Sequence, residues 1–281
     1  MISLRSFAND VAHLSAWLLV LSLIFIPLER LWALHPQKIF RRAVWTDLGY
    51  YVLNSLAVHS LLIVPMAMVA WGLHAVVPAA LRELASGLPY GERLPVAIVV
   101  GEFGCYWAHR WQHEVPFLWR FHAVHHSAEQ IDWLVSSRAH PLDIVFNRLC
   151  GFVPLYVFGL AEPIRNIADP VVVAVVLVST LWGYFVHANL RWRFGPLEWL
   201  VATPAFHHWH HTNDEHVNRN YSTMLPWMDR LFGTYFMPNR QWPARYGIDD
   251  KLPDAIGGQL LYPLRPRKEP PPTPGPAVTP G

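Results

Sequence analysis

The chain has 281 residues, of which 53% are hydrophobic and only 15% charged, and 14 are tryptophans. A soluble domain has about 25% charged residues, so this composition excludes an ordinary soluble enzyme, a coiled coil and a disordered chain, and favours a membrane protein. The formal net charge of +2 gives no reason to expect a nucleic-acid partner. The 16 histidines, nearly as many as the 20 acidic residues, need a chemical explanation.

Five apolar segments are the predicted membrane crossings, since a transmembrane helix needs about 20 mostly apolar residues. In chain order they are residues 11–28, 48–81, 94–108, 143–161 and 170–190; the third is short and carries Glu102, and the fourth either crosses or only dips into the membrane. The second is long for one crossing, and Pro65 within it is expected to kink the helix. The expected fold is all-α, a multi-span integral membrane helical bundle; buried core helices of a soluble protein are the alternative.

The basic residues Arg30, Lys38, Arg41 and Arg42 follow the first segment. Short loops rich in Lys and Arg usually face the cytoplasm, so we expect this loop to be cytoplasmic. If the later segments all cross, the histidine-rich part of the chain lies on the same side as a helical cap. The last residues, from Tyr262, are rich in proline and are expected to be extended or disordered.

Most of the histidines gather in three short boxes, whereas those at positions 13, 35, 59 and 74 are scattered and are expected to be packing residues. The boxes are His109-x-x-x-His113, His122-x-x-His125-His126 and His207-His208-x-His210-His211. On a helix, residues at i and i+4 share a face and lie about 5–6 Å apart at Cβ, so two imidazoles reach one ion. This spacing predicts metal binding.

The number of boxed imidazoles favours two metal ions over one. A structural zinc site uses four ligands, and the boxes offer about twice as many. Imidazole suits Zn, Cu, Fe and Ni, so the residues alone leave the metal open. A zinc site without catalysis stays open as an alternative, and so does a bis-histidine haem, although haem would leave most of the cluster unexplained.

The residues around the boxes resemble the fatty acid hydroxylase / sterol desaturase superfamily over roughly residues 94–235. Its three boxes are similar to residues 106–114, 117–127 and 194–211, and its closing segment is similar to Asn220-Tyr221 and residues 229–234. The resemblance implies a non-haem di-iron centre at the cytoplasmic face and O2-dependent hydroxylation of a lipid C–H bond. Desaturation of a sterol or other lipid is the alternative reaction, and a non-catalytic metal-binding membrane protein is the alternative class.

The resemblance also implies the ligands and the domains. The implied iron ligands are His109, His113, His122, His125, His126, His187, His207, His210 and His211. Together with the apolar and Pro-rich segments, the resemblance gives an expected N-terminal transmembrane region over 1–93, a fatty acid hydroxylase-like catalytic domain over 94–240 and a Pro-rich, disordered tail over 241–281. Two iron ions are expected, with zinc as a substitute in isolated protein.

Some positions depart from the family's pattern. His208 stands where the family often has Arg, so we do not expect it to be a ligand, and Ser222 and Met228 replace the usual Gly and Trp. His140 flanks the second box and is expected to hold a ligand by a hydrogen bond, whereas His216 is expected to be a loop residue.

The partners and the location follow from the same reasoning. The substrate is expected to reach the metals from the bilayer, with Trp107, Trp111 and Trp119 either lining its slot or forming an interfacial aromatic belt. The sequence shows no Rossmann glycine pattern, flavin signature or CxxC, so a separate reductase, ferredoxin, cytochrome or pterin is expected to supply electrons. We expect a bacterial-type inner membrane.

Overall fold

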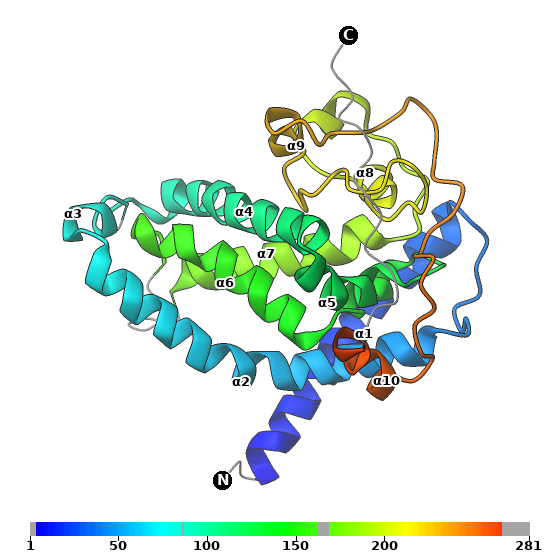
Figure 1. Ribbon diagram of the computed structural model, residues 1–281, viewed down its shortest axis with the longest axis horizontal. Coiled ribbons are helices and arrows are strands. Elements are labelled where there is room, and N and C mark those ends of the chain that lie inside the picture. The colour runs from blue at the N-terminus through cyan, green and yellow to red at the C-terminus, as the bar shows by residue number, and fades with distance from the viewer. Residues whose placement is uncertain (1–3, 86, 162–168, 266–281) are drawn as a thin grey trace.

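The computed structural model describes residues 4–85, 87–161 and 169–265. These ranges are helical, and the strand-like pairs within them are the isolated bridges Ala33–Leu190 and Thr212–Tyr246. In chain order, the α-helices are α1 (Leu4–Trp32), α2 (Val44–Val76), α3 (Ala79–Arg82), α4 (Tyr90–Glu114), α5 (Pro116–His126), α6 (Pro141–Val157), α7 (Pro170–His187), α8 (Pro204–His210), α9 (Trp227–Leu231) and α10 (Ile256–Leu260) (Figure 1). The 3-10 helices are η1 (Trp133–Ser137), η2 (Gly195–Trp199) and η3 (Tyr262–Leu264). The expected all-α class is confirmed.

Three helices in the described part of the chain are long and apolar enough to cross a membrane: Phe7–Trp32 in α1, Val44–Val76 as α2, and Pro170–His187 as α7. The second predicted crossing is one continuous helix that contains Pro65 and ends before Pro78. The predicted crossings over 94–108 and 143–161 form α4 and α6, but neither qualifies as a span. Helix α6 has only 17 residues, and α4 carries acidic and basic side chains along its length.

Helices α4 and α6 pack against each other, and against α7 and α2 respectively (Figure 1). Their close approach depends on two glycines. A Cβ at Gly104 would collide with the Cys150 carbonyl, and one at Gly151 would lie 2.7 Å from the Cys105 sulfur.

The end of α1, the start of α2 and the end of α7 meet at one end of the bundle. The amide of Leu34 donates to the Asn189 carbonyl at 3.1 Å, and the amide of Arg191 donates to the Trp32 carbonyl at 3.0 Å. The Glu29 carboxylate accepts the backbone N–H groups of Trp133 and Asn189, both at 2.8 Å. Helix α8 also reaches this end, because His208 Nε2 lies 3.2 Å from the Ala188 carbonyl just after α7.

A chain of buried charges ties the loop between α1 and α2 to η1. Arg41 pairs with Asp47 on α2 and with Asp132, while Arg138 pairs with the other oxygen of Asp47 at 2.5 Å. Asp132 also caps η1 by accepting the amide of Leu134 at 3.1 Å. Two arginines and two aspartates thus balance one another away from water. Arg41 is therefore held by protein partners, which weakens its use as a marker of membrane orientation.

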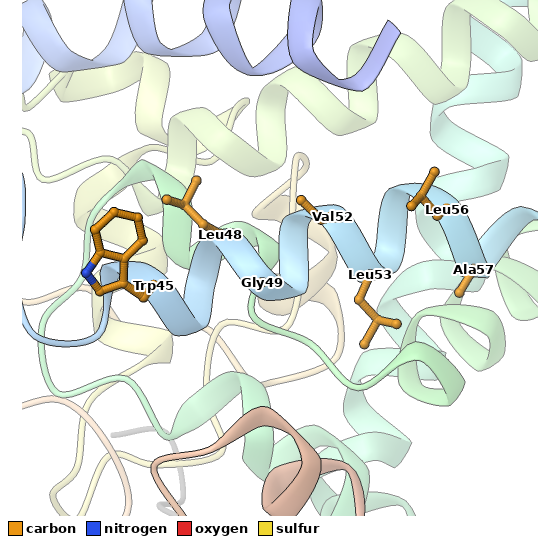
Figure 2. Close-up of a pocket in the computed structure, with 7 residues that line it drawn as sticks. All are labelled: Trp45, Leu48, Gly49, Val52, Leu53, Leu56 and Ala57. Atoms are coloured by element: carbon orange, nitrogen blue, oxygen red, sulfur yellow. The ribbon is translucent and has the colours of Figure 1, made fainter. Parts of the chain in front are cut away.

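A shallow apolar hollow of about 740 Å³ runs along one stretch of α2, from Trp45 to Ala57, and no histidine lines it (Figure 2). Gly49 in this stretch provides room for the Ile256 side chain of α10. Residues 241–265, assigned above to the tail, thus include α10 against α2 and η3 against α5. The rest of the predicted extended tail, residues 266–281, lies outside the described residues.

Candidate metal centre

Nine buried histidines from α4, α5, α7 and the α8 region converge in two groups. Within each group, one ring nitrogen per residue lies within 4.8 Å of the others. The groups adjoin, because the ring centroids of His126 and His211 are 4.4 Å apart. The first group is His109, His113, His122, His126 and His210, and the second group is His125, His187, His207 and His211. The structure therefore brings together all nine positions expected from the sequence.

The helical repeat divides two of the boxes between the groups. Because an α-helix turns about 100° per residue, the side chains at i and i+4 point in similar directions, whereas the side chain at i+3 points to the other side of i. On α5, His122 and His126 belong to the first group and His125 belongs to the second. In the third box, His207 and His211 belong to the second group and His210 to the first. The second and third boxes thus contribute to both groups, whereas both histidines of the first box belong to the first group.

Backbone carbonyls hold four of the rings from outside. The acceptors and Nδ1–O distances are Tyr221 for His109 (2.6 Å), Arg138 for His125 (2.9 Å), Gly183 for His187 (2.6 Å) and Arg219 for His210 (2.8 Å). A carbonyl only accepts, so Nδ1 carries the hydrogen in all four rings. Their Nε2 atoms are therefore bare lone pairs.

These lone pairs face each other inside the groups. The Nε2 atoms of His125 and His187 are 3.1 Å apart, and neither has a hydrogen to donate. The Nε2 atoms of His113, His126 and His210 are buried without any hydrogen-bond partner. A buried, unsatisfied polar atom costs about 1–3 kcal/mol. Cations between the rings would remove this cost, so the donor set fits two metal ions.

Side chains hold two further rings of the first group. Asp143 accepts from Nδ1 of His122 at 3.0 Å and from the Gln112 amide at 2.6 Å. The Asn218 side-chain oxygen lies 3.1 Å from Nδ1 of His113. Such partners orient ligand imidazoles and raise their basicity. The sequence reasoning missed Asp143, Gln112 and Asn218, because no local pattern marks them as partners of these rings.

A comparison with known proteins agrees with this geometry. The family model described as "Fatty acid hydroxylase" matches residues 94–234, half of the chain. The chain belongs to the fatty acid hydroxylase family. The match includes both histidine groups completely. No solved structure matches the chain significantly.

Several curated proteins are similar to this chain. An ornithine lipid hydroxylase from Rhizobium tropici is 35% identical over 178 residues, covering 63% of this chain and 51% of the relative. An alkylglycerol monooxygenase from Xenopus tropicalis is 32% identical over 149 residues, covering 52% and 31%. A Delta(7)-sterol 5(6)-desaturase from Gibberella zeae is 30% identical over 150 residues, covering 53% and 39%. The chain spans about half or less of the length of these curated relatives.

Two histidines near the family's boxes have structural partners. His208 is fully buried, with Nδ1 2.9 Å from the Tyr246 hydroxyl and Nε2 3.2 Å from the Ala188 carbonyl, and it belongs to neither group. His140 was expected to hold a ligand, but it instead accepts from the amide of Leu142 and bonds the Leu260 carbonyl, both at 3.2 Å. The Pro141 that follows starts α6, so His140 serves as its N-cap.

Burial keeps the imidazoles of the fatty acid hydroxylase centre uncharged. Burial lowers the pKa of His109 to about 3, and the nearby His122 adds to the effect. Burial raises the pKa of Asp143 to about 6, which still leaves its carboxylate mostly ionised at neutral pH. The imidazoles are thus unprotonated at pH 7, which is the form that binds metals.

Proposed function

We propose that this protein is a membrane-bound, non-haem di-iron oxygenase that uses O2 to hydroxylate a lipid C–H bond. The observation that carries the proposal is the pair of adjacent buried groups of five and four histidines, with inward lone pairs that lack hydrogen-bond partners. The relatives support the substrate class, since their names describe hydroxylation of ornithine lipid and oxygenation of alkylglycerol.

Two iron ions, held by the nine histidines, would supply the redox chemistry that cleaves O2 beside an unreactive C–H bond. The chain itself positions the histidine rings and excludes water from the site. Backbone carbonyls and Asp143 fix the rings so that their lone pairs point inward. The Trp119 ring lies 5.2 Å from His113 and 5.6 Å from His126 and covers the first group. Trp111, by contrast, is 42% exposed on the outside of α4.

We also propose that the electrons come from a separate donor, such as a reductase, ferredoxin, cytochrome or pterin. Hydroxylation takes two electrons and two protons besides O2, and reduces the second oxygen atom to water. The three apolar helices support a membrane location. We propose the bacterial inner membrane, with the histidines at the cytoplasmic side, because Arg30, Lys38 and Arg42 lie in or beside the loop at that end.

A lipid desaturase is the second candidate, and the sterol desaturase relative favours it. Both reactions begin with removal of a hydrogen from carbon, so the histidine geometry does not separate them. Comparative lipid mass spectrometry of cells with and without the protein does. Hydroxylation adds one oxygen atom to a lipid, whereas desaturation removes two hydrogens.

A second measurement distinguishes an enzyme from a membrane protein that binds metal without catalysis. Purified protein should contain iron in both groups, and His125→Ala should abolish the change in the lipids. One tightly held zinc ion, together with a lipid profile that is the same in wild type and His125→Ala cells, would contradict the proposal.

A further inference from the structure

One edge of the cap exposes large apolar side chains beside the spanning helices. We call it the η2–α9 edge, and it consists of Phe194, Leu197, Trp199, Leu200, Trp227 and Leu231. Leu231 is 68% exposed, Leu200 62% and Trp199 59%. Two distant stretches of chain form this edge, and the amide of Ala202 joins them by donating to the Met224 carbonyl at 2.8 Å.

The edge lies along the side of α7, not beyond its end. The Trp182 indole N–H donates to the Ala202 carbonyl at 3.2 Å, and the Ser179 hydroxyl lies 3.9 Å from the Met224 sulfur. Ser179 precedes the end of α7 at His187 by about 12 Å, at about 1.5 Å per residue. Because α7 is a candidate span, the polypeptide at Ala202 and Met224 lies at a depth that a bilayer would occupy.

Buried polar groups make this irregular segment suitable for such a depth. Non-helical backbone is tolerated near hydrocarbon only where protein satisfies its polar groups. The buried Glu102 carboxylate of α4 accepts the amides of Met224 at 2.6 Å and Leu225 at 3.4 Å. Phe232, just after α9, stacks on Tyr106 of α4 with ring centroids 5.1 Å apart. Glu102 thus holds the turn against the bundle.

The charged residue within the edge suits lipid headgroups. The Arg230 guanidinium lies between two rings, 3.4 Å from the Trp199 centroid and 3.6 Å from the Tyr235 centroid. Its Nε is buried without a hydrogen-bond partner, so the terminal nitrogens are the part of Arg230 left to meet a phosphate, and Arg230 forms no ion pair among the described residues. Tryptophan and arginine side by side are typical of the membrane–water interface, where the indole meets the acyl boundary and the cation meets phosphates.

We propose that the η2–α9 edge inserts into the headgroup region of the leaflet on the histidine side, with Arg230 facing phospholipid phosphates. The cap is then held in the membrane by its own surface as well as by the spans. The occupant is the phospholipid bilayer; a second copy of the chain or a soluble partner is the competing outcome.

Photocrosslinking tests the proposal in the full chain. The variants Leu231→p-benzoylphenylalanine and Leu200→p-benzoylphenylalanine are placed in nanodiscs that contain phosphatidylcholine and phosphatidylglycerol. The control is the same substitution at Glu215, an exposed residue of a different loop. We expect several-fold more lipid adduct at both edge positions than at the control, and less phosphatidylglycerol adduct at position 231 when Arg230→Gln is added.

Three results would overturn the proposal. Lipid adducts no more frequent at positions 231 and 200 than at 215 would show that the edge faces water. Crosslinks to a second copy of the chain would show a protein interface. Unchanged phosphatidylglycerol adduct in Arg230→Gln would show that Arg230 does not face phosphates. Use of two edge positions keeps the test valid if one variant does not fold.

Discussion

Arg138 and Asp47 form a buried ion pair, with Nε 2.5 Å from Oδ1, next to the ring of His125. The carbonyl of the same Arg138 accepts the Nδ1 hydrogen of His125 at 2.9 Å. Asp47 belongs to α2, so this helix fixes the position of a second-group histidine through one intermediate residue. Arg41 also pairs with Asp47 and with Asp132, so the buried positive and negative charges are equal in number.

Asp47→Asn is therefore expected to destabilise the protein and loosen the second group. It leaves Arg41 and Arg138 buried with one carboxylate between them, and breaking a buried pair costs about 3–5 kcal/mol. Thermal unfolding in detergent and metal content per chain measure the two effects. Asp254→Asn is the matched control, because its ion pair with Arg42 is fully at the surface and should contribute little. Equal melting temperatures for the two variants would contradict the account.

Asp143→Asn should weaken metal binding in the first group. The neutral amide still reaches His122 but no longer raises its basicity, and loss of such a partner typically costs about 10–100-fold in metal affinity. Chelator competition on purified protein measures the affinity. One of the two ions should be lost at lower chelator concentration while the other is unaffected. Simultaneous loss of both ions, or unchanged affinity, would show that Asp143 does not act on the first group alone.

His187→Ala and His113→Ala should each remove one ion of the two, because His187 belongs only to the second group and His113 only to the first. Elemental analysis of purified variants gives the count. His208→Ala is the control: it leaves both groups complete, although loss of its bonds to Tyr246 and Ala188 should lower the melting temperature. Loss of metal in His208→Ala would mean that the assignment of ligands needs revision.

Metal-free protein should become less stable as the pH falls below about 6.5, the ordinary histidine value. Burial lowers the pKa of His109 to about 3 and that of His208 to about 4. Between those values and about 6.5 the unfolded chain binds protons that the folded chain does not, so stability is complete above this window and is lost as pH falls through it. Each such histidine contributes a slope of up to about 1.4 kcal/mol per pH unit. Melting temperatures measured across this range in excess chelator, with a smaller slope for His208→Asn, check this expectation.

The sequence predicted the boxes well because helical spacing is a local property. Positions 109 to 126 and 207 to 211 needed only the i, i+3, i+4 rule, and His187 needed the family resemblance. The assignment of each imidazole to a group depends on how α4, α5, α7 and α8 cross, which no local pattern contains. For the same reason the Asp143 carboxylate on His122 and the Tyr221 carbonyl on His109 could not be found, since they lie 21 and 112 residues from those histidines.

Other features depended on the fold in a related way. Residues 94–108 and 143–161 were expected to enter the membrane because of their apolar content, and in the structure Glu102 in the first holds the turn at Met224, while Asp143 in the second holds His122. Their polar side chains have partners that only the fold supplies. His140 likewise has a local capping role that outweighs the expected contact with a ligand.

The four carbonyl-bound rings have a consequence for how the centre is filled. Since Nδ1 of His109, His125, His187 and His210 already donates outward, these imidazoles need neither turn nor ionise when an ion arrives. Uptake by them should therefore liberate almost no hydrogen ions, and the heat of loading should hardly vary between buffers of different ionisation enthalpy.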